Sequence, residues 1–360
     1  MTTRRALLVA LPLIGAGTGC AVGGDAYADA VSATWTLPPT ETGAGLPVRA
    51  LVQAATLAAN GHNTQPWRFV SRGRELIIQP DLSRRTPVVD PDDHHLFVSL
   101  GCATETLLLA ATAQGWSGEA RFLGPAEGVA VSLSPRRQAP DPLVAAIAHR
   151  ASTRADYDPR PVPTPTLRAL AASAGPEVAL SLITDRPRLN ALTALIVAGD
   201  DVQVADPAFR RELTQWIRFD AAEALARRDG LFSRSSGSPA LPRWLGARMF
   251  DLAFTVKGEA DKIARQMANT AGAAVFTGPS DDPAGWVAVG RAFTRFALTA
   301  TARGLKLAFL NQPVEDKPTR GRLAAWLGAP DRRPDLIVRF GEGPAMPRSL
   351  RRPVSAVLLT

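Results

Sequence analysis

The stretch HNTQPWRF, residues 62–69, decides how we interpret the rest of the chain. It follows an apolar run over 51–59 that predicts a helix, and the next glycine, Gly61, predicts a left-handed end to that helix. Pro66 disfavours helical backbone in the residue before it, so we expect Gln65 to be extended. The sequence therefore predicts a stiff polar loop between a helix and a strand. Its amide side chains can donate to a planar, oxygen-rich ligand.

The amino-acid composition limits the classes of protein to which the chain can belong. A chain of 360 residues with 46% hydrophobic content can bury a large core, in one large or two smaller domains. The net charge of +8 comes from scattered arginines, and no basic block alternates with aromatic residues, so we expect no nucleic-acid partner. The two cysteines, Cys20 and Cys102, predict no disulfide framework, and Cys102 is expected to be a small core residue.

Residues 1–30 have the charged, apolar and small-residue regions of a secretory signal. The pair Arg4-Arg5 resembles a twin-arginine signal, a route for proteins that fold before export, so we expect a protein of the cell envelope or periplasm. Cys20 resembles a lipidation site that would tether the protein to a membrane, although glycine stands where such sites prefer leucine. Cleavage after Ala30 is the alternative. Residues 31–46, rich in Pro, Thr and Gly, are expected to form a tether.

The chain contains an internal repeat. At a constant offset, Gly101 aligns with Gly290, and apolar residues on both sides of each glycine align as well. Both segments predict helices that are apolar on nearly every face and therefore buried. A weaker match aligns residues 49–55 with 168–174. The repeat predicts two related halves, 47–145 and 146–360, with extra residues in the second half.

We place that insertion at 197–267. Phe209, Leu213, Trp216 and Ile217 recur at helical spacing on one face, and Asp229-Gly230 predicts a turn. We interpret the insertion as a helical lid over a ligand site. The alternative is a structural flap that extends the core.

Short strand signals flank the helices. They predict a hairpin over 67–70 and 75–79, and further strands at 129–133, 178–183, 306–310 and 336–340. Helices mixed with hairpins and small antiparallel or mixed sheets predict the α+β class. An acidic and histidine-rich cluster precedes one central helix without the regular spacing of metal ligands, so we expect a solvated helix cap and no metal site there; its members are Asp90, Asp92, Asp93, His94 and His95.

Two motifs resemble those of the nitroreductase family. The loop over 60–67 is similar to the flavin-contacting Asn-x-Gln-Pro-Trp loop, with Ala59-Asn60 in place of the usual Pro-Ser. The second half begins with HRASTR, residues 149–154, which resembles the Arg-Arg-Ser-x-Arg that binds the ribityl phosphate in that family. Each half has only one of the two motifs. The chain thus resembles a fused pseudo-dimer of the Acg-like branch.

The resemblance implies an FMN cofactor and a set of residues that hold it. Planar guanidinium groups suit a phosphate, at about 1.5 to 3 kcal/mol per charge-assisted hydrogen bond. One of the arginines in the tail is implied to reach the phosphate, and a loop after the second central helix is implied to face the redox edge of the flavin. The implied cofactor-binding residues are Asn60, His62, Asn63, Gln65, Arg150, Ser152, Arg154, Leu310, Asn311, Gln312, Arg348, Arg351 and Arg352.

We therefore expect an FMN-dependent oxidoreductase that passes hydride or electrons to a small acceptor, such as a nitroaromatic or quinone, with NAD(P)H as an expected donor. The flavin carries the chemistry, so no catalytic side chain is named. The alternative is a flavin-storage protein with a closed lid and little turnover. Because one chain supplies both parts of the site, we expect a monomer with one FMN.

Overall fold

A computed structural model describes residues 19–41, 45–136 and 139–359, so the predicted twin-arginine signal lies outside the described residues. The helices are α1 (Gly19–Thr34), α2 (Val48–Thr56), α3 (His94–Ala113), α4 (Val144–Ile147), α5 (Thr164–Ser173), α6 (Arg186–Ala205), α7 (Pro207–Trp216), α8 (Ala221–Arg227), α9 (Arg243–Ala253), α10 (Val256–Ala268), α11 (Pro283–Ala302), α12 (Gln312–Glu315) and α13 (Lys317–Trp326). The strands are β1 (Trp67–Arg72), β2 (Glu75–Pro80), β3 (Trp116–Gly124), β4 (Gly128–Pro135), β5 (Ala179–Ile183), β6 (Ile217–Arg218), β7 (Leu231–Phe232), β8 (Gly272–Thr277), β9 (Lys306–Phe309), β10 (Pro334–Gly341) and β11 (Leu358–Leu359).

The first half of the chain builds a five-stranded sheet in the order β11-β1-β2-β4-β3. The predicted hairpin is confirmed: β1 and β2 pair antiparallel, and the turn between them contains Gly73 at φ 63°. Trp67 and Phe69 are buried while Arg68 is exposed, as expected for a strand with one face on the core. The last strand, β11, returns from the end of the chain and pairs parallel with β1.

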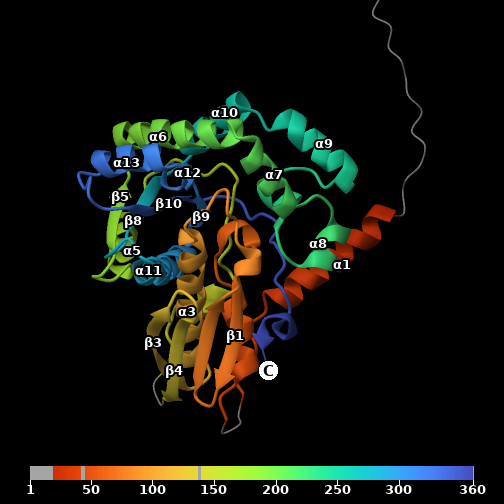
Figure 1. Cartoon of the computed structure of the whole chain (residues 1–360), viewed down its shortest axis with the longest axis vertical. Helices are drawn as coiled ribbons and strands as arrows, with labels where there is room; N and C mark the ends of the chain where they lie inside the picture. Colours follow the sequence, from red (N-terminus) through yellow and green to blue (C-terminus); the bar gives the residue numbers. More distant parts are fainter. Residues whose placement is uncertain (1–18, 42–44, 137–138, 360) are drawn as a thin grey trace, which may run out of the picture.

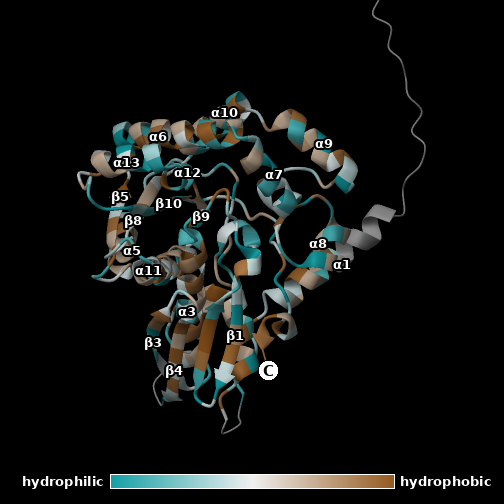
Figure 2. Cartoon of the chain, in the orientation of Figure 1, coloured by the Kyte–Doolittle hydropathy of each residue, from teal (hydrophilic) through white to brown (hydrophobic). Residues whose placement is uncertain are grey.

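The second half builds a four-stranded sheet in the order β5-β8-β10-β9. Strands β8 and β10 are buried along their whole length, because helices cover both faces of this sheet (Figure 1). The sequence predicted three of its strands but missed β8. With both sheets flanked by helices, the predicted α+β class is confirmed. In Figure 2 the strands of the first sheet carry the broadest hydrophobic bands.

The two halves meet where α3 crosses α11. A Cβ atom on Gly101 would lie 2.1 Å from the carbonyl oxygen of Val287, and one on Gly290 would lie 2.0 Å from that of Val98. The two glycines aligned by the internal repeat therefore allow the helix backbones to touch. Cys102 is buried at this crossing, as predicted. Helix α3 is apolar and long enough to cross a membrane, but 89% of its most apolar 18-residue segment is buried inside the protein.

The expected insertion is helical, as predicted, and contains α7, α8, α9 and α10. Residue 197, its expected start, lies inside α6, so the boundary falls within a continuous helix. Helix α7 ends at Trp216, and Ile217 begins the short strand β6 instead of extending the helix. Gly230 has φ 71° and forms the predicted turn.

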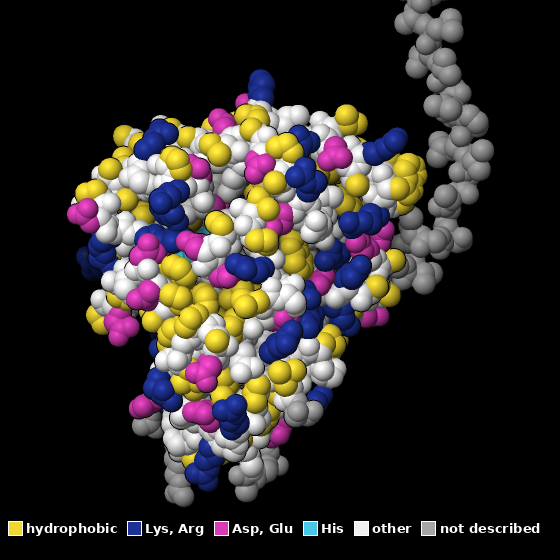
Figure 3. All heavy atoms as spheres, viewed as in Figure 1, with side chains coloured by type: hydrophobic (Ala, Val, Ile, Leu, Met, Phe, Trp, Pro, Cys, Tyr) yellow, Lys and Arg dark blue, Asp and Glu magenta, His cyan; other side chains and the backbone are white. Residues whose placement is uncertain are grey.

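The N-terminal segment packs on the body of the protein. Residues 31–34 form the last turn of α1 instead of extended tether, and Tyr27 and Trp35 are buried. Figure 1 shows α1 running beside α8. The side chain of Cys20 lies outside the described residues. On the face in Figure 3, Lys and Arg side chains are mixed with Asp and Glu.

Candidate functional site

A cavity of about 480 Å³ lies where the two halves and the insertion meet. Residues 59–63 come from the first half, 150–154 and 308–312 from the second half, and 347–351 from the C-terminal segment. All the predicted cofactor-binding residues line it except Gln65 and Arg352. The structure thus brings together motifs that lie far apart in the sequence.

The backbone of the predicted loop differs from the expectation. Gly61 does not have a positive φ; instead His62, Asn63 and Gln65 do, at 45°, 54° and 53°. The predictions of a left-handed Gly61 and an extended Gln65 are therefore wrong. Left-handed backbone is uncommon outside glycine and persists where surrounding contacts hold it. Here the backbone N–H of Gln65 donates to the side-chain oxygen of Asn60 at 2.9 Å.

The amide side chains of the loop bind other parts of the chain. The Nδ2 atom of Asn63 donates to the carbonyl oxygens of Gly230 and Leu350, at 2.9 and 3.0 Å. The Nε2 atom of Gln65 donates to the carbonyl oxygen of Arg228 at 3.0 Å, and its Oε1 accepts from the backbone N–H of Arg352 at 2.7 Å. These amide groups join the first half to the insertion and to the C-terminal segment.

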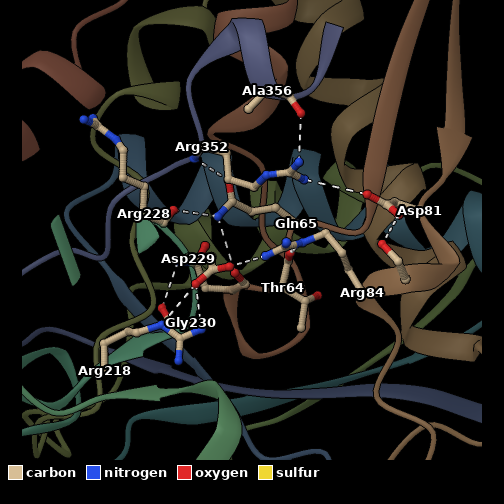
Figure 4. A network of polar contacts seen from close by, with 12 residues as sticks. Thr64, Gln65, Asp81, Arg84, Arg218, Arg228, Asp229, Gly230, Arg352 and Ala356 are labelled. Atoms are coloured by element: carbon tan, nitrogen blue, oxygen red, sulfur yellow. Dashed lines mark hydrogen bonds and ion pairs between the residues drawn. The ribbon is translucent and has the colours of Figure 1, made fainter. Parts of the chain in front are cut away.

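A buried ionic network strengthens the same junction (Figure 4). Arg84 donates to the carbonyl oxygen of Thr64 and forms an ion pair with Asp229 of the insertion. Arg218 donates to the other carboxylate oxygen of Asp229, Oδ1, from Nε at 3.0 Å and from Nη2 at 2.6 Å. We did not predict this network, because its members lie far apart in sequence and belong to no recognised motif.

One end of the cavity is cationic. Arg150 donates to the carbonyl oxygen of Leu57 at 3.2 Å, and Arg348 donates to backbone carbonyls of the 148–149 turn. Among the described residues, neither of these arginines nor Arg351 forms an ion pair. Burial, reinforced by repulsion from neighbouring arginines, lowers the pKa of Arg150 to about 10 and that of Arg351 to about 9. An anion bound here would favour the charged guanidinium groups and so oppose this lowering of their pKa.

The arginines differ in the donors they leave free. Arg351 donates to the carbonyl oxygens of Thr56 and Ala58 and to the side-chain oxygen of Asn63, so it is occupied within the protein. Arg352 does not line the cavity; it donates to the carbonyl oxygen of Ala356 at 2.8 Å. Arg150 and Arg348 therefore remain in this cluster as the arginines that can bind a phosphate, while Arg154 lines the cavity close enough to His62 to affect its pKa. Ser152 lines the same wall beside its backbone bridge to Leu307.

Another part of the cavity wall carries carboxyl and amide groups. The side-chain oxygen of Asn311 accepts from the backbone N–H of Ile337 at 2.9 Å, which fixes the loop that contains Leu310. The Nε2 atom of Gln312 donates to Asp200 at 3.1 Å, while the Oε1 atom of Gln312 and the Oδ2 atom of Asp200 have no partner among the described residues. Burial raises the pKa of Asp200 to about 6.

His62 and His95 also line the cavity. The Nε2 atom of His95 lies 3.1 Å from Glu315, and Gln203 donates to the other oxygen of that carboxylate at 2.6 Å. The Nδ1 atom of His62 is buried and has no hydrogen-bond partner among the described residues. Burial lowers the pKa of His62 to about 4, so its imidazole is neutral at pH 7. Asp200, Gln203 and Glu315 were not predicted from the sequence.

The cluster at the start of α3 is only partly solvated: Asp92 is exposed, whereas two other members are not. Asp90 and His94 are buried. Asp90 does cap the helix, because it accepts from the backbone N–H groups of His95 and Leu96, both at 3.0 Å. Asp335 of β10 contacts His94 at 2.9 Å and covers the cluster. Among residues 19–41, 45–136 and 139–359, no group of three or more His, Cys, Asp or Glu side chains could hold a metal ion.

The insertion supplies the apolar wall of the cavity. Phe209, Leu213, Phe250 and Phe254 line it, and the rings of Phe250 and Phe254 stack at 4.6 Å between centroids. Trp244, also in the insertion, is 71% exposed and does not line the cavity. The arrangement suits an elongated ligand with an anionic group at one end and a planar ring with polar edges at the other.

We compared the chain with known proteins. No family model matches it. The Mycobacterium tuberculosis protein named "Putative NAD(P)H nitroreductase Rv3131" is 29% identical over 326 residues, which cover 86% of this chain and 90% of that protein. The protein named "Putative NAD(P)H nitroreductase acg", from the same organism, is 23% identical over 331 residues, 86% of this chain and 94% of that protein.

Two solved structures are also similar in part. One is the FMN-dependent nitroreductase NfnB from Mycobacterium smegmatis in complex with NADPH, with 15% identity, a TM-score of 0.35, and coverage of 55% of this chain and 86% of that one. The other is a nitroreductase with bound FMN from Desulfitobacterium hafniense, with 13% identity, a TM-score of 0.38, and coverage of 59% and 95%. Over most of its length the chain is therefore similar to proteins named as NAD(P)H nitroreductases, including an Acg-like one, which agrees with the resemblance of its two motifs.

Proposed function

We propose that the protein is an FMN-dependent oxidoreductase with a single flavin site in the cavity between its halves. The observation that carries this proposal is the cationic end of the cavity. Arg150 and Arg348 are held there by backbone carbonyls, with no carboxylate partner in the part of the chain that the structure describes, in the same cavity as the loop that resembles a flavin-contacting loop. The volume of about 480 Å³ is within the usual range for cofactor sites.

Each part of the cavity has a role in this proposal. Arg150, Arg154 and Ser152 bind the phosphate of FMN, and the apolar wall of the insertion excludes water from the ring. The neutral imidazole of His62 and the backbone of 310–312 also line the cavity. When bound, the flavin supplies hydride and electron transfer, while the protein binds, orients and shields it. The names of the relatives support NAD(P)H as the donor, and the acceptor is proposed to be a small nitroaromatic or quinone-like molecule.

The proposal is tested by titrating FMN into the purified protein and recording the visible spectrum. The double variant Arg150→Ala/Arg154→Ala is expected to weaken FMN binding by about 3 to 6 kcal/mol if two charge-assisted contacts are lost. Arg303→Ala is the control, because that exposed arginine contacts only the carbonyl of Thr299 on its own helix. A wild-type protein that takes up no FMN, or a double variant with unchanged affinity, would contradict the proposal.

A second candidate function is flavin storage without turnover. The observation that favours it is the attachment of the insertion to the first half. Asp229 of the insertion forms ion pairs with Arg84 and Arg218, and Arg84 also donates to the carbonyl oxygen of Thr64. These contacts hold the apolar wall of the insertion against the loop at Thr64. In stopped-flow mixing with NADPH, rapid bleaching of the bound flavin would exclude storage. Slow bleaching in the wild type that becomes fast in Asp229→Ala would support a lid that gates access.

We also propose export to the cell envelope and a monomeric state. The paired arginines at positions 4 and 5 support export. The monomer is supported by the assembly of both predicted motifs around one cavity within one chain. Light scattering of the leader-free protein, combined with flavin absorbance, should give one FMN per monomer; a stable dimer would contradict this part of the proposal.

A further inference from the structure

The N-terminal segment reaches the cationic end of the cavity. Trp35, directly after α1, lines the cavity, and its ring is surrounded by three guanidinium groups. The ring centroid lies 4.8 Å from the guanidinium carbon of Arg351, 4.9 Å from that of Arg348 and 6.0 Å from that of Arg150. These distances are typical of cation–π contacts, so the indole ring faces cations that have no carboxylate partner among the described residues.

Hydrogen bonds fix the position of this ring. The Nε1 atom of Trp35 donates to the carbonyl oxygen of Ser349 at 3.1 Å. In the residue directly before it, the side-chain oxygen of Thr34 accepts from Nη2 of Arg228 at 3.2 Å. Earlier in the same helix, the hydroxyl of Tyr27 donates to the carbonyl oxygen of Arg348 at 2.6 Å. The segment therefore contacts both the C-terminal segment and the insertion.

Apolar packing holds the same segment on the insertion. The ring of Tyr27 lies 4.4 Å from the ring of Phe232, between centroids, and both are buried in one cluster with Ala224 and Leu350. Trp35 belongs to the main core. A contact that combines a buried cluster with hydrogen bonds at both ends is expected to stay closed in the folded protein.

We propose that residues 27–35 form a strap that closes the phosphate end of the flavin site, with Trp35 as a further cofactor-positioning residue. This inference rests on the proposed function. The indole ring holds Arg150 and Arg348 in place and keeps water away from the phosphate, which strengthens charge-assisted hydrogen bonds. Cleavage of the leader after Ala30 would remove Tyr27, so the strap requires a mature chain that begins before Tyr27.

The test compares FMN with riboflavin, which lacks the phosphate, in the full chain. Trp35→Leu keeps an apolar side chain in the core but removes the π face. We expect it to weaken FMN binding about tenfold, as for the loss of one desolvated cation–π contact, and to change riboflavin binding by less than about threefold. Trp35→Phe keeps an aromatic face and should recover most of the FMN affinity. Trp244→Leu is the control, because Trp244 is exposed outside the cavity.

Salt dependence gives a second measurement. If the strap shields the phosphate end, the affinity of Trp35→Leu for FMN should fall more steeply with added salt than that of the wild type, because exposed charges are screened more than buried ones. Equal losses of FMN and riboflavin affinity in Trp35→Leu would show a general packing role and overturn the proposal. The same conclusion would follow from an unchanged FMN affinity in that variant.

Two further measurements test the strap if Trp35→Leu does not fold or if the wild type binds no flavin. If Trp35→Leu does not fold, Tyr27→Phe decides: it removes the hydroxyl bond to the 348 carbonyl but keeps the ring on Phe232, and it should weaken FMN more than riboflavin. If the wild type binds no flavin, the proposed function fails. The strap is then judged by the rise in melting temperature with inorganic phosphate, which Trp35→Leu should abolish; an equal rise in both proteins would overturn it.

Discussion

Helices α2 and α5 hold equivalent places in the two halves, yet they end differently. Each packs on the central helix of its own half, α2 on α3 and α5 on α11. After α5 the chain turns at Gly175, with φ 75°, as the glycine rule for helix ends predicts. After α2 the left-handed residues are His62, Asn63 and Gln65, which are not glycines. The helix end beside the predicted flavin loop departs from the glycine rule, while the equivalent helix end of the second half follows it.

We expect the largest effect on stability from a change at the crossing of α3 and α11, to which both halves contribute. Gly290→Ala would place a Cβ 2.0 Å from the carbonyl oxygen of Val98, so the two helices must separate. We expect the free energy of unfolding to fall by about 3 kcal/mol or more. Gly321→Ala in α13 is the control: a Cβ there meets nothing within 4 Å, and stability should rise by roughly 0.5 to 1 kcal/mol. Urea denaturation measures both, and equal stabilities would argue against the close crossing.

The next effect concerns the loop that only the first half has. Gln65→Ala removes the side-chain bonds to the Arg228 carbonyl and the Arg352 amide, both of which then lose a partner. We expect a loss of about 2 to 3 kcal/mol in the free energy of unfolding. Gln53→Ala removes a single exposed bond to the carbonyl of Thr36 and should cost less than about 0.5 kcal/mol. A Gln65 variant as stable as the Gln53 variant would mean that the loop does not hold the insertion.

We expect the smallest effect on stability from Asp200, which lies in α6 of the second half. Burial disfavours the ionised carboxylate and raises its pKa from the ordinary 3.8 to about 6 in the folded protein. The folded state therefore binds more protons between about pH 4 and pH 6, and the free energy of unfolding falls as the pH rises through that window.

Asp200→Asn removes this titration and can still accept from Gln312. Relative to the wild type, the variant should gain about 1 to 2 kcal/mol in going from pH 4 to pH 8, after allowance for screening. Denaturation curves at the two pH values measure the gain. Parallel pH profiles for the two proteins would show that the group does not titrate in this window.

The features that could be predicted from the sequence depend on local patterns. The glycines of the two central helices recur at a fixed offset, and two strand-like runs flank the turn at Gly73, so both features can be recognised in the sequence. Most of the predicted cofactor-binding residues line one cavity because two short motifs carry them. Strand β8 was missed because its small residues, Gly-Ala-Ala, carry a weak strand signal.

The rest depends on contacts between distant segments. The left-handed backbone at Asn63 is held by Gly230 and Leu350, which no local pattern connects to it. The free donors of Arg150 and the occupied donors of Arg351 can be told apart only when their carbonyl partners are known. Trp35 followed an expected export signal and was assigned to a tether, because its contacts lie more than 300 residues away.

Because α3 and α11 cross within one chain, dilution of the protein does not separate the two halves of the site. A site assembled from two separate chains comes apart as the protein concentration falls, because its assembly obeys mass action. Here the two helices belong to one chain, so each half meets the other at an effective concentration that does not change with the surroundings. Release into a large external volume would leave the cavity intact, and its affinity for a ligand should be the same at any protein concentration.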